Sequence, residues 1–236
     1  MAHNPTTDPH NLEGRITFDR GHNPDPPASD CDAGEALDQN NVLIEVLHEV
    51  DLFEEDSKEV ESHFFQRVER QLKMLRGLTH VNVAEFQGWM VMLEDESWLR
   101  AKAVHARCEG GKIMAYLSIN ANVDRRDLVL GVSRGLLYLH SKGIVHGNLN
   151  PSNVHIDYDV QRRPVPRISG FESSYTITDD DPVNLKMEGP CSAPLRYIAP
   201  EVMAQLGFLC GQKGDIWSFG CTSSQVLHAF YVPTSN

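Results

Sequence analysis

Apolar positions in the first half of the chain predict a strand followed by an amphipathic helix. The run from Val42 to Leu47 is six residues long, mostly apolar and rich in β-branched side chains, with one carboxylate, Glu45, inside it. Such a run is typical of a buried strand. Apolar residues then recur in steps of 4, 4, 3 and 3 at Phe64, Val68, Leu72, Leu75 and Leu78. This spacing predicts one face of a helix that ends between Gly77 and His80.

The next segments predict two further strands and then a helical region. Phe86 to Leu93 and Trp98 to Ala106 have strand-like composition and are followed by a Gly110-Gly111 break. After the break, apolar residues step by 3, 4 and 3 at Val129, Val132, Leu136 and Leu139. We expect a helix there that stops at Lys142-Gly143, and another from about Asp215 to Phe230.

Two stretches lack apolar periodicity. Residues 1 to about 40 are rich in Pro, Asp, Asn, Gly and His, which predicts a disordered N-terminal segment. The stretch from Asp157 to Leu195 is mostly polar and contains Pro182, Pro190 and Pro194, so we expect a long loop rather than packed structure.

Four motifs, in order, resemble those of eukaryotic protein kinases. The segment from Gly143 to Val154 resembles the catalytic loop H-R-D-L-x-x-x-N and directly follows a predicted helix. Residues 168–172 lie where D-F-G belongs, residues 199–201 match A-P-E, and residues 215–220 resemble the family's next helix. The resemblance covers Val42 to Phe230. It is greatest to tyrosine-kinase-like Ser/Thr kinases, in which a glycine such as Gly147 often follows the loop histidine.

The resemblance implies an α+β, bilobal fold of the protein kinase type. A small antiparallel β lobe with one helix would span 41–107, after the disordered segment 1–40. A mainly helical large lobe, incomplete because it lacks the family's last helices, would span 108–236. The family places a hinge near Cys108 to Gly111 and binds ATP between the lobes.

Aligned to the family, the small lobe has lost its charge pair. Glu45 lies where the strand lysine should meet the phosphates, and a carboxylate there would repel a triphosphate. Gln71 lies where the helix glutamate should pair with that lysine. A Gln71 amide donating to the Glu45 carboxylate could still tether the helix. A register slip of one residue would instead turn Glu45 to solvent.

The large lobe has lost its base and its metal ligand. Asn148 replaces the catalytic aspartate and has no basic function near neutral pH. Gly170 replaces the Mg²⁺-binding aspartate, which leaves Asn153 as the one remnant of the metal site, and a neutral amide alone is a poor Mg²⁺ ligand. Asn150 replaces the loop's basic residue, and Glu172 replaces the glycine of D-F-G. We therefore expect no catalytic residue, no bound cofactor and no metal.

Some family positions are retained, namely His146, Asn153, Phe171, Glu201 and Asp215. In the family, residues corresponding to His146, Phe171, Leu75 and Asp215 stack into a spine. A simpler interpretation is that His146 and Asn153 satisfy backbone groups of a buried loop. Residues in the position of a phosphorylated activation loop are Ser173, Ser174, Thr176 and Thr178.

Composition narrows the choice of partners. The chain has 33 acidic against 21 basic residues, a formal charge of -12, which argues against nucleic acid or anionic membrane as a general partner. Five cysteines without a C-x-x-C pair predict neither disulfides nor zinc. No run approaches the roughly 18 apolar residues of a membrane span. We expect a cytoplasmic or nuclear protein.

Three functions stay open. The first is a catalytically inactive pseudokinase that acts in signalling as a scaffold or as an allosteric partner of an active kinase. The second is a Ser/Thr-type kinase with weak or atypical ATP phosphotransfer, which would need ATP, Mg²⁺ and a carboxylate reaching the phosphate site, with Glu45, Glu172 and Asp157 as candidates. The third is a truncated, non-functional gene product.

Overall fold

A computed structural model describes residues 36–37, 42–51, 57–94, 98–177, 194–204 and 210–228. The chain divides into two compact units. The first unit comprises residues up to Leu78 and Glu85–Arg107, and the second comprises Thr79–Ala84 and the chain from Cys108 onward. Within the described residues, the first unit is a sheet with one helix and the second is rich in helices, which confirms the α+β class.

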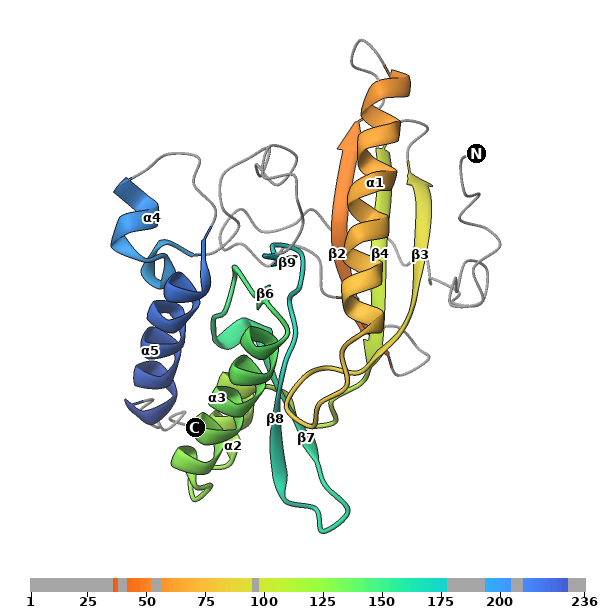
Figure 1. Ribbon diagram of the computed structural model, residues 1–236. Coiled ribbons are helices and arrows are strands. Elements are labelled where there is room, and N and C mark those ends of the chain that lie inside the picture. Colours follow the sequence, from red (N-terminus) through yellow and green to blue (C-terminus); the bar gives the residue numbers. More distant parts are fainter. Residues whose placement is uncertain are drawn as a thin grey trace, which may run out of the picture. The chain divides into compact units, whose positions relative to one another are not determined.

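The first unit is a four-stranded antiparallel sheet, in the order β1-β2-β4-β3, with one long helix (Figure 1). Its elements are β1 (Ala36–Leu37), β2 (Val42–Asp51), α1 (Ser57–Arg76), β3 (Phe86–Glu94) and β4 (Trp98–Ala106). The three predicted strands and the predicted helix are therefore confirmed. Strand β1 lies inside the segment expected to be disordered, so that prediction is wrong at Ala36–Leu37, and the rest of that segment lies outside the described residues.

Pairing in this sheet separates two faces. Ile44, Met90 and Val104 are buried together on one face. On the other face, Glu45 lies opposite Ala103. A β-bulge between Val46 and His48 then resets the alternation and places His48 opposite Ala101. Glu45 and His48 consequently share a face although they are three residues apart in the sequence.

Helix α1 packs through the apolar stripe that the sequence predicts. Its buried positions include Phe64, Val68, Leu72 and Leu75, which are spaced as one helical face. The stripe begins at Phe64 and continues toward the C-terminal end of the helix, which lies along the sheet in Figure 1. Because one face of α1 is apolar and the other is charged, the helix is fixed in rotation about its own axis.

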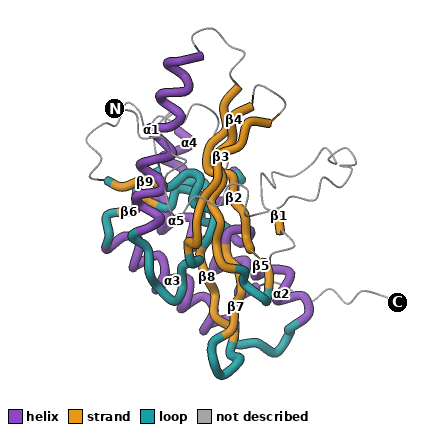
Figure 2. The backbone as a smooth tube through the Cα atoms, turned by 90° about the vertical axis from the view of Figure 1, so that its right-hand side faces the viewer, coloured by secondary structure: helices purple, strands orange, loops and turns teal. Residues whose placement is uncertain are grey.

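Besides the short 3-10 helices Pro151–Asn153 and Leu195–Tyr197, the second unit contains four α-helices and five short strands among the described residues (Figure 2). In chain order these are β5 (Gly111–Lys112), α2 (Ile113–Ile119), α3 (Arg125–Ser141), β6 (Ile144–Val145), β7 (Val154–Tyr158), β8 (Pro164–Ile168), β9 (Tyr175–Thr176), α4 (Pro200–Ala204) and α5 (Gln212–His228). Helices α3 and α5 confirm the two predicted for this region. The short helices α2 and α4 were not predicted.

Strands β7 and β8 form a hairpin where the sequence predicts a loop from Asp157 onward, so that prediction is wrong over the hairpin. The prolines of β8 are tolerated because they face away from β7. The Ile168 N–H points away from β7, because it donates to the Asn82 carbonyl. The backbone nitrogens of Pro166 and Pro164, two and four residues earlier, lie on the same edge of β8, where no N–H donor to β7 is needed. Residues 178–193 of the expected loop lie outside the described residues.

Helix α3 lies unusually close to the segment Thr79–Ala84 and to β8. A Cβ atom added at Gly135 would be 2.5 Å from the Asn82 carbonyl oxygen, and one added at Gly131 would be 2.4 Å from the Pro166 ring. The Asn82 side chain donates to the Pro166 carbonyl at 2.9 Å. The loop that follows α3 is therefore positioned by a helix whose glycines allow close contact with the Asn82 backbone and the Pro166 ring.

We expect Gly135→Ala to destabilise the protein by about 1–3 kcal/mol, because overpacking against the Asn82 backbone outweighs the gain of about 1 kcal/mol in helix propensity. Gly220→Ala in α5 is the matched control, since nothing lies within 4 Å of its added Cβ. This control should be neutral or stabilising. Urea unfolding of both variants measures the difference, and equal effects would contradict the close approach.

Candidate functional site

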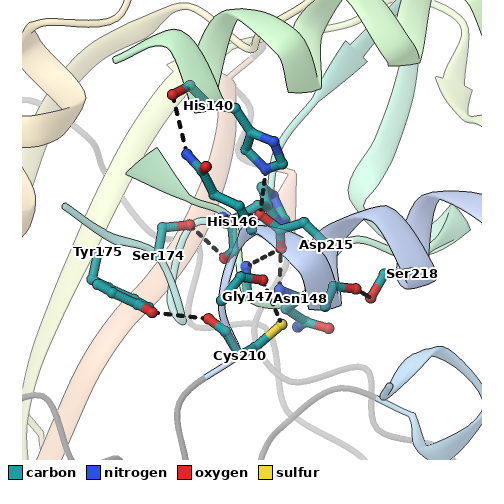
Figure 3. A network of polar contacts seen from close by, with 12 residues as sticks. His140, His146, Gly147, Asn148, Ser174, Tyr175, Cys210, Asp215 and Ser218 are labelled. Carbon is teal, nitrogen blue, oxygen red and sulfur yellow. Dashed lines mark hydrogen bonds and ion pairs between the residues drawn. The ribbon is translucent and has the colours of Figure 1, made fainter. Parts of the chain in front are cut away.

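The centre of the candidate site is the buried carboxylate of Asp215, in the first turn of α5 (Figure 3). Asp215 is 0% exposed. Its Oδ1 accepts from the Gly147 N–H at 2.9 Å, and its Oδ2 accepts from the His146 N–H at 2.8 Å. Oδ2 also lies 2.9 Å from His140 Nε2, at the end of α3. The Asp215 side chain therefore connects α5 both to the end of α3 and to the loop that contains His146 and Gly147.

The loop histidine is held in one tautomer. His146 Nδ1 accepts from the Asn148 N–H at 3.2 Å, so the ring proton is on Nε2, which donates to the Ser169 carbonyl at 2.8 Å. The His146 and Phe171 rings lie 5.4 Å apart between centroids. Ser174 donates to the His146 carbonyl at 2.7 Å. His146 thus links the loop to the segment after β8.

Three asparagines and one glutamate fill the rest of the loop. The backbone carbonyl of Asn148 accepts from Asn153 Nδ2 at 2.8 Å and from Asn150 Nδ2 at 3.1 Å. Asn150 Nδ2 also donates to Asn148 Oδ1 at 3.0 Å. The remaining amide group of Asn148, Nδ2, donates to Glu172 Oε1. The side-chain amides of Asn150 and Asn153 are therefore hydrogen-bonded to Asn148, and that of Asn148 is hydrogen-bonded to the Glu172 carboxylate.

Gly170 leaves little room for a side chain. Its φ is +77°, a backbone conformation that side chains disfavour. An added Cβ would be 2.2 Å from Asn153 Cγ and 2.6 Å from Asn153 Oδ1. The Asn153 side chain therefore occupies the volume into which an aspartate at position 170 would extend.

Glu45 lies inside the first unit and is not turned to solvent. It is 3% exposed, so the alternative of a register slip is wrong. Its Oε2 lies 3.3 Å from Nε2 of His105, which is 0% exposed. A carboxylate removed from water is stabilised by a neighbouring group that donates a proton or shares one.

Gln71 connects α1 to the sheet through His48. The side chains of Gln71 and His48 are hydrogen-bonded. The pKa of His48 is lowered to about 4, chiefly by burial and also by the nearby Arg67 charge, while the bond to Gln71 opposes both effects. His48 is therefore neutral at physiological pH, and α1 is tethered by a neutral contact. The expected Gln71–Glu45 bond stays a prediction.

Sequence comparison assigns the family. The family model of the protein kinase domain matches residues 40–233. The chain belongs to the protein kinase family. This match confirms the resemblance read from the four motifs and the kinase-type bilobal class, whereas the tyrosine-kinase-like subgroup stays a prediction.

Relatives of this kinase domain include Ser/Thr kinases and MAP kinase kinase kinases. It is 32% identical over 167 residues, or 68% of its length, to MAP kinase kinase kinase mkh1 of Schizosaccharomyces pombe. It is 28% identical over 189 residues, or 75% of its length, to mitogen-activated protein kinase kinase kinase 5 of Arabidopsis thaliana. The matches cover 14% and 24% of those two relatives, so the chain corresponds to a small part of each.

The other positions marked by the kinase motifs are dispersed. Glu201 is exposed in α4, and Asp157 pairs with Arg167 at 3.0 Å across the β7–β8 hairpin. Leu75 is buried in the first unit. Of the activation-loop hydroxyls, Ser174 bonds the His146 carbonyl, and Thr178 lies outside the described residues.

Three participants in this kinase domain were not expected from the sequence. His105 lies on the same face of β4 as Ala101 and Ala103, at every second position, so a period-2 pattern could have marked it as buried. His48 reaches the helix-facing side only through the bulge, for which the sequence offers no signal. His140 is the basic residue in the last turn of α3, a position where a contact beyond the helix end is common.

Neither a membrane span nor a metal cluster is found in the part of the chain that the structure describes. No helix there is long and apolar enough to cross a membrane. No group of three or more His, Cys, Asp or Glu side chains there is arranged to hold a metal ion.

We expect the stability of this kinase domain to fall as the pH falls from about 6.5 to about 4. In that window the unfolded chain binds a proton at His48 and the folded chain does not, because the folded pKa is about 4. The loss attributable to His48 is about 1–3 kcal/mol. Urea unfolding at several pH values measures it.

The matched control is His48→Gln, which keeps a polar side chain but does not titrate. Its stability should decline less steeply over the same window. Identical pH profiles for the two proteins would show that His48 is not held neutral.

Proposed function

We propose that this kinase domain does not transfer phosphate and acts by binding another protein, as a scaffold or as an allosteric partner of an active kinase. The observation that carries the proposal is the Asn153 side chain lying against Gly170, in the volume that a metal-binding aspartate would need. The relatives of this chain include MAP kinase kinase kinases and Ser/Thr kinases. The residues that this chain lacks are those on which phosphoryl transfer depends in the family.

Asn148 supports the proposal because it cannot accept a proton. Its side-chain oxygen accepts from Asn150, and its nitrogen donates to Glu172. Exchanging the two would set an amide oxygen against a carboxylate oxygen, so the assignment is fixed by the network. An amide whose oxygen accepts one hydrogen bond and whose nitrogen donates another is unsuited to act as a base.

The donor set does not fit Mg²⁺. Mg²⁺ prefers octahedral oxygen ligands that include one or two carboxylates. Asn153 is a neutral amide whose nitrogen donates to the Asn148 carbonyl, and position 170 carries no side chain. We therefore assign no catalytic step to a bound metal.

Glu45 adds a charge argument in the first unit. The family uses a lysine at this position to attract phosphates, and a carboxylate reverses the sign of that interaction. Glu45 is turned toward His105 within the unit. Its role under this proposal is structural, because it fixes β2 to β4 in the absence of the family's ion pair.

The net charge supports a protein partner rather than nucleic acid or an anionic membrane, since both of these are themselves negative. A cytoplasmic or nuclear location remains part of the proposal.

One observation favours the alternative of weak or atypical kinase activity. Glu172 is a carboxylate that reaches the catalytic loop, where it bonds Asn148. Under this alternative, Glu172 would take the role of the base, and ATP with Mg²⁺ would be required. The same bond weighs against the role, because a carboxylate that accepts an amide hydrogen bond is a weaker proton acceptor.

We expect no phosphate transfer from ATP to generic protein substrates by the wild-type protein or by Asn148→Asp. Catalytic groups act as a unit, so restoring one of several lost charges gains little. A radiolabel transfer assay, with an active Ser/Thr kinase as positive control, measures this. Transfer that is abolished by Asn153→Ala, or by Glu172→Gln, would overturn the inactive assignment and favour the alternative.

We expect Gly170→Asp to destabilise the protein by about 2–4 kcal/mol, the sum of backbone strain at positive φ and overlap with Asn153. Gly143→Asp is the matched control, since its φ is +70° and nothing lies within 4 Å of its added Cβ. The control should lose only about 1–2 kcal/mol.

Adding Asn153→Ala to Gly170→Asp should recover the excess loss, because it removes the overlapping atoms. Urea unfolding of the wild type, of Gly170→Asp, of Gly143→Asp and of the double variant measures these differences. If Gly170→Asp and Gly143→Asp were equally destabilising, position 170 would have room for the family's aspartate.

A further inference from the structure

The segment after β8 is attached to the catalytic loop by a contact that the kinase motifs do not include. Glu172 follows Phe171 in a turn, in which the Ser174 N–H donates to the Phe171 carbonyl at 3.0 Å. This turn directs the Glu172 carboxylate to Asn148, 24 residues earlier in the sequence. The family has glycine at this position, so the carboxylate is an addition of this chain.

Further contacts in the same segment converge on the same loop. Ser174 Oγ donates to the His146 carbonyl at 2.7 Å. Ile144 and Val145 of β6 pair with Thr176 and Tyr175 of β9, and the Ile177 N–H donates to the Gly143 carbonyl at 2.8 Å. The segment is therefore held along its length, and Glu172 supplies the charged end of the attachment.

Glu172 also occupies a specific chemical position. Asn148 lies where the family's base accepts the proton of a substrate hydroxyl, and its side-chain amide nitrogen donates to Glu172. A hydroxyl approaching Asn148 would have to displace a carboxylate from a charge-assisted hydrogen bond. The site is thus filled by an acceptor from the same chain.

We infer that Glu172 is an internal ligand of the catalytic loop, which holds the segment Gly170–Ile177 against that loop without nucleotide or metal and blocks the substrate-hydroxyl position. The inference rests on the proposed function, because it explains how a loop without its charged ligands keeps one conformation. Glu172 acts as a positioning residue. The conformation of the segment consequently does not depend on the nucleotide concentration.

Side-chain exchange tests the inference. Asn148→Asp alone sets two carboxylates against each other, and Glu172→Ala alone removes the acceptor. The double variant Asn148→Asp/Glu172→Gln exchanges the two roles, so that the introduced glutamine amide donates to the introduced aspartate. Asn150 keeps its acceptor in that variant, since an aspartate oxygen replaces the amide oxygen.

The readout is amide hydrogen exchange of Ser174 and Ile177 in the full chain. We expect about tenfold faster exchange at Ser174 and Ile177 in Glu172→Ala and in Asn148→Asp, and a rate within about threefold of wild type in the exchanged double variant. In Asn148→Asp, lowering the pH should slow the excess opening, because one of the two carboxylates then becomes protonated. Glu109→Gln, which alters an exposed pair with Arg162, should leave these rates unchanged.

Two results would overturn the inference. One is exchange in Glu172→Ala equal to that of wild type. The other is a double variant that opens as fast as Asn148→Asp alone. Phosphate transfer measured on the same proteins separates the two proposals, since activity in the wild type would refute the inactive assignment while the coupling between Glu172 and Asn148 could still be present.

Discussion

The buried carboxylate of Asp215 is the interaction on which the second unit depends. It has no access to solvent, and it accepts from two successive backbone N–H groups, those of His146 and Gly147, while it contacts the ring of His140. A buried carboxylate is stable only when its lone pairs are satisfied in this way. If the loop separated from α5, the Asp215 carboxylate would lose its two backbone donors and remain as a buried charge without them. The shape of the loop is therefore maintained by a residue that takes no part in phosphoryl transfer.

This arrangement separates the shape of a kinase loop from its chemistry. His146 and Asp215 maintain the backbone and the Phe171 contact, whereas the positions that would hold a proton or a metal carry Asn148 and Gly170. Other side chains of the same chain contact these two positions: Asn153 lies against Gly170, and the Glu172 carboxylate accepts from Asn148. In the first unit the same principle holds for Glu45 beside His105 and for Gln71 bonded to His48. Under the proposed function, partner binding requires this shape and does not require the charges.

Periodicity and motif order were sufficient to predict much of the fold. The apolar spacing along α1 and α3 was long enough to define one face, and the strands β3 and β4 were bounded by clear turn signals. The β7–β8 hairpin was missed because the stretch from Asp157 to Leu195 is mostly polar and contains Pro182, Pro190 and Pro194, which favour a loop. The tolerance of Pro164 and Pro166 in β8 depends on which edge of the strand they face. Helix α2 has seven residues, too few for a helical period to appear. Motif alignment located Asn148, Gly170 and Glu45, but the partners of Glu45 and Glu172 come from tertiary contacts, and His48 turns inward only because of a bulge.

The central claim is that a kinase fold is retained here while its phosphate and metal chemistry is lost. Calorimetric titration of the wild-type protein with ATP, in the presence and absence of Mg²⁺, tests it most directly. We predict no saturable heat at millimolar ATP under either condition, because Glu45 opposes the phosphates and the residues near Gly170 do not form a Mg²⁺ site. Saturable binding that requires Mg²⁺ and is lost in Asn153→Ala would contradict the account.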